Sequence, residues 1–447
     1  MKTPSLTPRA TVVLLLASVL PLIDSSLVNV LLPAIGHDLG AAESDVQLGV
    51  SVYMLAATAG IVLSTTCLRR FGSRQVWTGA VLVFALASAL VGFSGTLPLF
   101  VASRALQGAA CGFIMPAVQQ IAADLVGREG MRSALATIGL PAVIAPAVGP
   151  LLGGLLVDAV GWRPLFLVNV PVAALALVLA PGVLPPASRG NRSPLGVGQA
   201  LPGVLGMVGL LWVVSTIGGS SADVLLPATA VAVLAIAAFC VLDLRSATPL
   251  LDMSLYRGAS FATVMLLCLI VGGVFYGTLL STSLHVQSDL GQPAWVAGVL
   301  LGAQGLGAWA SRSLIKGPWK HMDAFPVIGT GLVVAAVGTV GIDIVGSWSP
   351  LAAMVMVASS LVRGLGLGAC TLLALSAAYE VVSDRQTPSV GAHTRLMLQL
   401  GGALGTALVG VWNSSAAALS VPVAVVSLAG ATAALAVHRQ QSNRVGA

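Results

Sequence analysis

The chain has 447 residues, of which 57% are hydrophobic and only 8% are charged, and its mean hydropathy is +0.98. Soluble domains carry roughly 25% charged residues, so most of this chain cannot face water. The net charge of +6 comes from lysines and arginines that lie scattered, without a basic cluster interleaved with aromatic residues, which argues against a nucleic-acid partner. The five cysteines lie in or beside apolar runs, and their spacing fits neither a disulfide framework nor a metal site.

Apolar runs long enough to cross a bilayer, which takes about 20 residues, recur along the whole sequence. We expect fourteen spanning helices, and the segments between them are too short for a soluble domain. The fold class that follows is an all-α integral membrane protein. In chain order the expected spans cover residues 10–32, 46–67, 76–94, 97–121, 133–157, 163–184, 197–216, 224–242, 261–283, 294–314, 325–346, 350–376, 396–415 and 419–437.

The positive charges predict the orientation of these spans. With the N-terminus in the cytoplasm, 18 of the 21 Lys and Arg residues fall in cytoplasmic segments, whereas the acidic residues show no bias. Such an asymmetry in Lys and Arg alone follows the positive-inside rule. We therefore expect a multi-pass protein with both termini in the cytoplasm.

Two pairs of segments, one member of each pair in each half of the chain, resemble each other. RALQGAACG at residues 104–112 resembles RGLGLGACT at residues 363–371, and residues 148–157 resemble residues 400–410 in the next span of each half. Two related helical halves are a common transporter architecture. The expected parts are an N-terminal six-helix bundle, two additional helices with their loops, and a C-terminal six-helix bundle, at residues 1–192, 193–257 and 258–447.

Three ionisable residues fall inside the apolar runs: Asp24, Arg104 and Arg363. An ionisable group in hydrocarbon costs at least ~2.5–3.5 kcal/mol and is usually retained for a function. Asp24, as the only carboxylate, is the first candidate for a proton or cation site. Asp24 and Arg104 lie at similar depth, roughly 10–12 Å below the outer surface, so they can pair if their helices are neighbours. The alternatives are a static ion pair or a solvated residue at the rim for Asp24 and, for Arg363, capping of backbone carbonyls.

Other polar residues in the runs are candidates for a substrate cavity. Arg104 is followed one turn later by Gln107, and then by small residues that allow close helix approach. His285, at the end of the ninth run, could shuttle protons near neutral pH, although a lone histidine at a membrane interface is often inert. The full set of cavity candidates is Asn29, Gln107, Tyr276, His285, Gln304, Arg363 and Gln399.

The fifth run is unusually rich in glycine and proline. Prolines remove backbone donors and bend a helix, and glycines permit tight contact, so a flexible helix at the seam between two halves is one interpretation. Frequent glycine and proline in spanning helices is the other. The residues concerned are Pro146, Gly149, Pro150, Gly153 and Gly154.

No motif for catalysis is present. The sequence has no P-loop, GxSxG elbow, HExxH or CxxC, and no cluster of histidines or paired carboxylates in a span. We therefore expect no enzyme activity, no metal and no cofactor. If the protein transports a solute, the energy must come from an ion gradient.

Several of these segments together resemble the signatures of the major facilitator superfamily, and more closely of its fourteen-span drug:proton antiporter family. They are IDSSLVNVLLP (residues 23–33), RALQGAACGF (104–113), the Gly/Pro stretch of the fifth run, GWRPLFLVNVPVA (161–173) and PLLDMSLYRGASF (249–261). The resemblance implies two six-helix bundles that export hydrophobic or cationic compounds, such as drugs or antibiotics, in exchange for protons by alternating access. It also implies a monomer in the lipid of a bacterial plasma (inner) membrane.

The resemblance assigns roles to particular residues. The family's acidic position in the first span corresponds to Asp24 and its arginine in the fourth span to Arg104, which implies proton coupling at this pair. The antiporter signature corresponds to Gly149, Pro150, Gly153 and Gly154, within the Gly/Pro helix that also contains Pro146.

The loop between the second and third spans departs from the family pattern. CLRRFGSR (residues 67–74) has Arg69 where the family has an aspartate that helps to latch the inner gate, and Thr65 where it has a glycine. Reduced or narrow activity is therefore open, as are a dedicated transporter of one natural metabolite and a non-transporting membrane sensor or scaffold. The gate-loop residues are Arg69, Arg70, Gly72 and Arg74.

Overall fold

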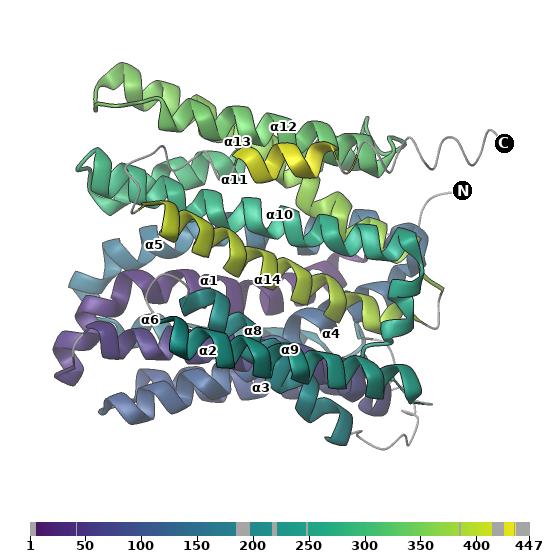
Figure 1. Ribbon diagram of the computed structural model, residues 1–447. Helices are drawn as coiled ribbons and strands as arrows, with labels where there is room; N and C mark the ends of the chain where they lie inside the picture. Colours follow the sequence, from purple (N-terminus) through teal and green to yellow (C-terminus); the bar gives the residue numbers. More distant parts are fainter. Residues whose placement is uncertain are drawn as a thin grey trace. The chain divides into compact units, whose positions relative to one another are not determined.

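The computed structural model describes residues 6–41, 43–184, 197–216, 221–246, 249–383, 386–413, 424–432 and 434. These residues are helical apart from short connections (Figure 1). Within them, eight helices are long and apolar enough to cross a membrane, and two shorter apolar helices cover residues 163–179 and 198–214. The predicted all-α membrane class is confirmed, and the number of fourteen spans stays a prediction.

The helices follow one another along the chain with few intervening residues. The first half contains α1 (Pro8–Leu39), α2 (Glu43–Phe71), α3 (Ser73–Gly92), α4 (Leu97–Ile138), α5 (Pro141–Val160), α6 (Arg163–Leu167), α7 (Asn169–Leu179), α8 (Val197–Thr216) and α9 (Ala222–Arg245). The second half contains the 3-10 helix η1 (Met253–Arg257), α10 (Ala259–Leu284), the π-helix η2 (His285–Asp289), α11 (Ala294–Lys316), α12 (Ala324–Asp343), α13 (Pro350–Glu380) and α14 (Thr387–Asn413).

Several helix ends differ from the expected spans, and local chemistry explains them. The expected span 133–157 is divided between α4 and α5, because Pro141 has no N–H with which to continue the hydrogen-bond ladder after Gly139 and Leu140. Within α4 the backbone leaves helical geometry at Gly127, where φ is 64°. Helix α1 continues seven residues beyond the expected end at residue 32, to a left-handed cap at Gly40 with φ of 61°.

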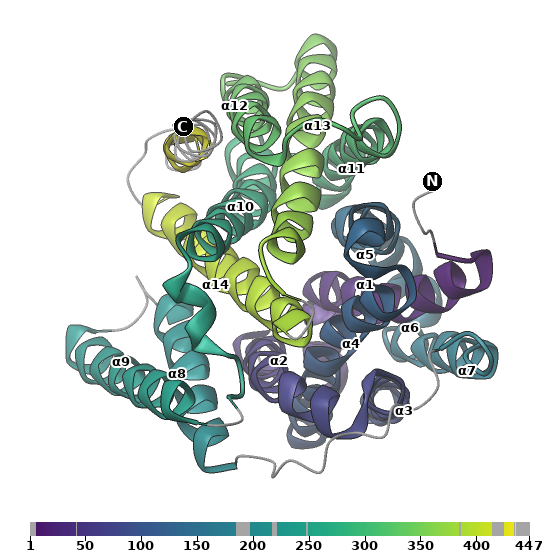
Figure 2. The ribbon, with the colours of Figure 1, turned by 90° about the vertical axis from the view of Figure 1, so that its right-hand side faces the viewer.

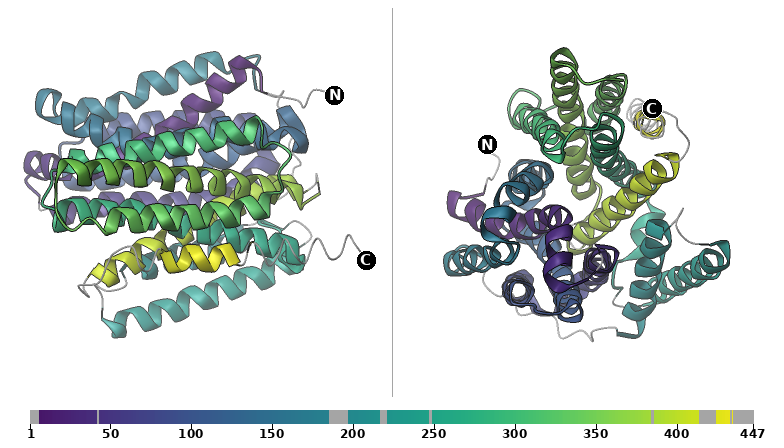
Figure 3. Two further views of the ribbon diagram at one scale, coloured as in Figure 1. Left: turned by 90° about the horizontal axis from the view of Figure 1, so that it is seen from above. Right: turned by 90° about the vertical axis from the view of Figure 1, so that its left-hand side faces the viewer.

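The described chain forms two compact units. Unit 1 comprises Met1–Trp212, Asp223–Ser254 and Ser383–Leu396, and unit 2 comprises Val213–Ala222, Leu255–Val382 and Met397–Ala447. In unit 1, α4 packs against α2 and α3, and α1 packs against α5; in unit 2, α13 packs against α10, α11 and α12 (Figure 2). The helices α10 to α13 of unit 2, coloured teal to green, lie side by side in the further views as well (Figure 3). The expected boundaries at residues 192 and 257 stay a prediction.

Both units use small residues to bring helix backbones into contact. A Cβ atom on Gly108 of α4 would lie 2.2 Å from the carbonyl oxygen of Tyr53 in α2. In unit 2 a Cβ atom on Gly364 of α13 would lie 2.0 Å from the carbonyl oxygen of Gln304 in α11. Only glycine fits at such distances, so the sequence places α2 against α4 and α11 against α13 in the same way.

Candidate functional site

The buried ion pair that the sequence predicts is present in unit 1. Asp24 comes from the middle of α1 and Arg104 from the second turn of α4, and Arg104 Nη1 lies 2.5 Å from Asp24 Oδ2. Both side chains have 0% of their surface exposed. The two side chains are in direct contact, so α1 and α4 bring the pair together as their similar depth allows.

Amide side chains complete the contacts of the carboxylate. Gln107 Nε2 donates to Asp24 Oδ1 at 2.9 Å, and Asn169 Nδ2 of α7 donates to the same oxygen at 3.0 Å. Gln107 also accepts from Arg104 Nη1 at 2.5 Å and donates to Ser88 Oγ of α3 at 2.8 Å. Each carboxylate oxygen therefore accepts at least one hydrogen bond, and the side chains that make this polar cluster come from α1, α3, α4 and α7.

Sequence reasoning missed Asn169 and Ser88. Asn169 lies within the segment GWRPLFLVNVPVA, and the signal that could have found it is an amide inside an otherwise apolar run. Ser88 gives no such signal, because serine is common in spanning helices and satisfies its own hydroxyl readily. Only the packing of α7 against α1 and α3 brings Asn169 to the carboxylate and Ser88 to the amides that bind it.

Aromatic rings cover the rest of the guanidinium. Arg104 Cζ lies 4.2 Å from the ring centroid of Tyr53 and 5.8 Å from that of Phe166. Within the described residues, Nε and Nη2 of Arg104 have no hydrogen-bond partner. Because the face of an aromatic ring attracts a cation, the rings compensate part of this loss.

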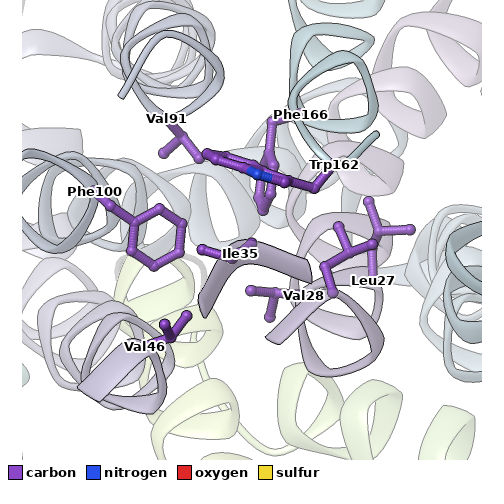
Figure 4. Packing of buried hydrophobic residues seen from close by; sticks show 9 residues of the cluster. Leu27, Val28, Ile35, Val46, Val91, Phe100, Trp162 and Phe166 are labelled. Atoms are coloured by element: carbon purple, nitrogen blue, oxygen red, sulfur yellow. The ribbon is translucent and has the colours of Figure 1, made fainter. Parts of the chain in front are cut away.

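Buried apolar residues cover the polar residues around Asp24 on the side that faces the expected outer surface. Leu27, Val28 and other buried residues of the last turns of α1 pack with Phe100, Trp162 and Phe166. Figure 4 shows the Trp162 ring close to Phe166, and the ring centroids of these two residues are 6.1 Å apart. Phe166 belongs to this cluster and also faces Arg104, so hydrophobic packing and the ion pair share a side chain.

The Gly/Pro helix α5 touches α1 beside the acidic residue. A Cβ atom on Gly149 would lie 2.5 Å from Ser26 Cβ and 3.0 Å from the backbone nitrogen of Leu27. These contacts are two and three residues after Asp24, so α5 is close enough to respond to a movement of α1. Gly153 is buried. The side chains of Pro146, Pro150 and Asn29, and the surroundings of Gly154, lie outside the described residues.

Unit 2 contains the remaining cavity candidates, in separate places. Arg363 is fully buried and donates from Nη1 to Thr282 Oγ1 at 2.8 Å. His285 Nδ1 lies 2.8 Å from Asp289 Oδ2, and Nε2 lies 3.1 Å from the Val345 carbonyl oxygen. Gln304 is buried, Gln399 is half-buried, and Tyr276 is 39% exposed with its ring packed over Gly402.

The gate loop makes an unexpected contact through the residue that departs from the family pattern. Arg69 Nη2 donates to the carbonyl oxygens of Pro249 and Leu250, 180 and 181 residues away in sequence, the latter at 3.1 Å. Arg70 lies over the Phe71 ring, and Gly72 has φ of 82° at the start of α3, which requires glycine. Arg74 is half-buried.

The segment that Arg69 contacts is held from two further sides. Asp243, at the end of α9, accepts from the backbone N–H groups of Leu250 and Met253 at 2.5 and 2.8 Å. His393 of α14 lies at the carbonyl oxygen of Leu251 and donates to it through Nε2. His393 precedes the expected span 396–415, and burial lowers its pKa despite that carbonyl and the nearby Asp243.

Comparison with known proteins identifies the family of the chain. The model of the family described as Major Facilitator Superfamily matches residues 14–406. The chain belongs to the major facilitator superfamily. Within it, the Multidrug resistance protein B homolog of Mycobacterium tuberculosis is 31% identical over 418 residues, covering 90% of this chain and 75% of that protein. The Puromycin resistance protein pur8 of Streptomyces alboniger is 30% identical over 424 residues, covering 91% and 82%.

A solved structure of the superfamily shares the fold. The human organic anion transporter MFSD10 (TETRAN) has a TM-score of 0.69 with this chain at 17% sequence identity, covering 96% of this chain and 100% of that one. At this identity the likeness shows the fold alone. The match to the family model confirms the predicted superfamily, and a superfamily of transporters rather than enzymes agrees with the expectation of no enzyme activity.

Proposed function

We propose that this major facilitator superfamily protein exports small hydrophobic compounds, such as drugs or antibiotics, in exchange for protons by alternating access. The observation that supports the proposal most is the dry ion pair of Asp24 and Arg104, with both side chains fully buried. Protonation of Asp24 removes the charge with which Arg104 is paired, so uptake of a proton and rearrangement of the helices α1 and α4 are coupled.

The printed names of the relatives point to the class of substrate. The proteins named above from Mycobacterium tuberculosis and Streptomyces alboniger are a multidrug resistance homolog and a puromycin resistance protein. We infer a comparable role in drug or antibiotic resistance for this chain. The changed gate loop favours a narrow range of substrates. A dedicated exporter of one natural metabolite is the alternative within transport.

The proposal includes the finer features expected from the sequence. They are fourteen spans in two six-helix bundles with an inserted pair, both termini in the cytoplasm, a bacterial plasma membrane and a monomeric state. The strong bias of Lys and Arg to one side supports the orientation.

Transport is tested with the purified full chain in proteoliposomes that contain a pH-sensitive dye. A proton gradient, acidic inside, is imposed, and puromycin or another compound from an antibiotic panel is added outside. We expect compound-dependent loss of protons from the lumen in the wild type and none with Asp24→Asn. The matched control is Asp38→Asn, which removes a carboxylate of unit 1 that is 40% exposed.

The outcomes separate the candidate functions. Proton loss with several unrelated compounds supports multidrug export, and proton loss with one compound supports a dedicated exporter. Compound-dependent proton loss that is unchanged in Asp24→Asn places coupling elsewhere in the chain. No proton loss with any compound, in a preparation that still binds them, refutes proton-coupled export.

A further inference from the structure

The buried arginine of unit 2 has almost none of the partners that a buried cation needs. Arg363 has 0% of its surface exposed, and its one hydrogen bond runs from Nη1 to Thr282 Oγ1. Thr282 donates its own proton to the Thr278 carbonyl oxygen at 2.8 Å, so its oxygen is free to accept from the arginine. Within the described residues, Nε and Nη2 of Arg363 have no hydrogen-bond partner.

Arg104 of unit 1 shows how this fold compensates the charge of a buried arginine, although within the described residues its Nε and Nη2 also have no hydrogen-bond partner. The two residues start the similar segments RALQGAACG and RGLGLGACT, and the helices α4 and α13 pack against their neighbours in corresponding ways. Arg104 has a carboxylate, an amide oxygen and an aromatic ring around it. Around Arg363 the described residues provide neither a carboxylate within 4.0 Å nor a ring under the guanidinium.

Two acidic residues of unit 2 lie beside His285 and not beside Arg363. Asp289 and Asp343 lie 2.8 and 4.0 Å from His285 Nδ1, one helical turn beyond Thr282. An apolar cluster that includes Val286, Val345 and Met356 covers this end of the unit. The chain therefore supplies no counter-charge to Arg363 within the part that the structure describes, although an unpaired cation in hydrocarbon is strongly disfavoured.

A hydroxyl group close to Arg363 along α13 also has no partner, and with the guanidinium it provides hydrogen-bond donors for an anion. Ser360 lies one turn earlier on α13, and its buried Oγ has no partner among the described residues. Adjacent Nε and Nη2 groups of an arginine form the planar fork that binds a carboxylate through two parallel hydrogen bonds. A hydroxyl donor one turn away adds a third contact to the same group.

We propose that Arg363, positioned by Thr282 and assisted by Ser360, is the subsite for an anionic group of the transported compound, foremost a carboxylate. The inference rests on the proposed export function and narrows its substrate class. It opposes the expectation of cationic substrates, because the buried acid of unit 1 is already paired whereas the buried base of unit 2 is not. The site is sealed in the described structure, so a ligand reaches it when α10 and α13 separate during the transport cycle.

The test compares rhodamine B, which has a free carboxylate, with rhodamine B methyl ester, which has the same ring system without that charge. Binding of each dye to the purified full chain in detergent is measured by fluorescence anisotropy. We expect the acid to bind about 10- to 100-fold more tightly than the ester, as for a charge-assisted hydrogen-bonded pair. Arg363→Gln is expected to abolish this preference while the affinity for the ester stays within about threefold of the wild type.

Arg312→Gln is the matched control. Arg312 is another arginine of unit 2, 4% exposed, whose Nη2 donates to a hydroxyl, that of Thr371, at 3.1 Å. It lies about one turn before the C-terminal end of α11, near the negative end of the helix dipole, which favours a cation without any ligand. We expect the preference for the acid to survive in this variant.

Two results overturn the subsite, and the first does not depend on the folding of a variant. One is a wild type that shows no preference for the acid over the ester, including a wild type that binds neither dye. The other is an equal loss of affinity for both dyes in Arg363→Gln. Binding is measured without a proton gradient, so a preference for the acid combined with no proton-driven transport refutes the proposed function and leaves the subsite standing.

Discussion

Replacing Asp24 by asparagine tests the buried ion pair with almost no change in side-chain volume. One of the two carboxylate oxygens becomes an amino group, so it faces either Arg104 or the two amides of Gln107 and Asn169, all of which are donors. Removing one partner of a buried ion pair costs about 3–5 kcal/mol, because the other charge stays buried without compensation. We expect Asp24→Asn to lower the free energy of unfolding by that amount. The contact of Arg104 with the Tyr53 ring remains in the variant and still stabilises the arginine in part.

The measurement is thermal unfolding of the purified protein in detergent, followed by tryptophan fluorescence. At roughly 2–4 °C per kcal/mol, the expected decrease in Tm is on the order of 6–20 °C. Asp38→Asn is the control: Asp38 pairs with Arg163 at 2.5 Å, but the two side chains are 40% and 37% exposed. An exposed pair contributes about 0–1 kcal/mol, so its Tm is expected to change little.

A double variant separates stability from coupling. Asp24→Asn combined with Arg104→Gln leaves no buried charge in the cluster, and we expect it to regain most of the lost Tm while gradient-driven transport stays absent. Equal decreases in Tm for Asp24→Asn and Asp38→Asn would refute the reasoning, because burial would then contribute nothing to the strength of the pair. Restored transport in the double variant would show that the proton site lies elsewhere.

Three further predictions concern packing and the segment held by Arg69. Gly108→Ala places a Cβ atom 2.2 Å from a carbonyl oxygen of α2, so it is expected to lower Tm and yield of folded protein, whereas Gly79→Ala, with nothing within 4 Å, is expected to change neither. Asp243→Asn removes the charge that accepts from backbone N–H groups, so faster hydrogen exchange at residues 250–253 is expected, and unchanged exchange would contradict this role. Burial lowers the pKa of His393, so the attachment of the same segment is expected to be intact above about pH 6.5. It is expected to weaken as the pH falls through the lowered pKa, because protonation then favours the unfolded chain. Hydrogen exchange of the segment measured from pH 7.5 to 5 should show this acid sensitivity, and His393→Gln should remove it.

Much of the fold and the centre of the site could be predicted from the sequence, because a membrane penalises charge. A charged side chain within an apolar run is rare and expensive, so Asp24 and Arg104 are visible without any knowledge of packing. The ends of the helices are harder to predict, because hydropathy reports the length of an apolar run and not where the hydrogen-bond ladder stops. Pro141 and the cap at Gly40 decide those ends through local backbone chemistry.

The sequence by itself determined the all-helical membrane class, the superfamily and the buried pair of unit 1. Tertiary structure alone decided which neutral side chains join that pair, since Asn169 and Ser88 cost little in a span and become significant only where α7 packs against α1 and α3. It also decided that Arg69 reaches a segment 180 residues away, and that Arg363 meets a hydroxyl where Arg104 meets a carboxylate. The physical reason is the same in each case: hydrogen bonds and ion pairs act over about 3 Å, and only packing sets which groups come within that distance.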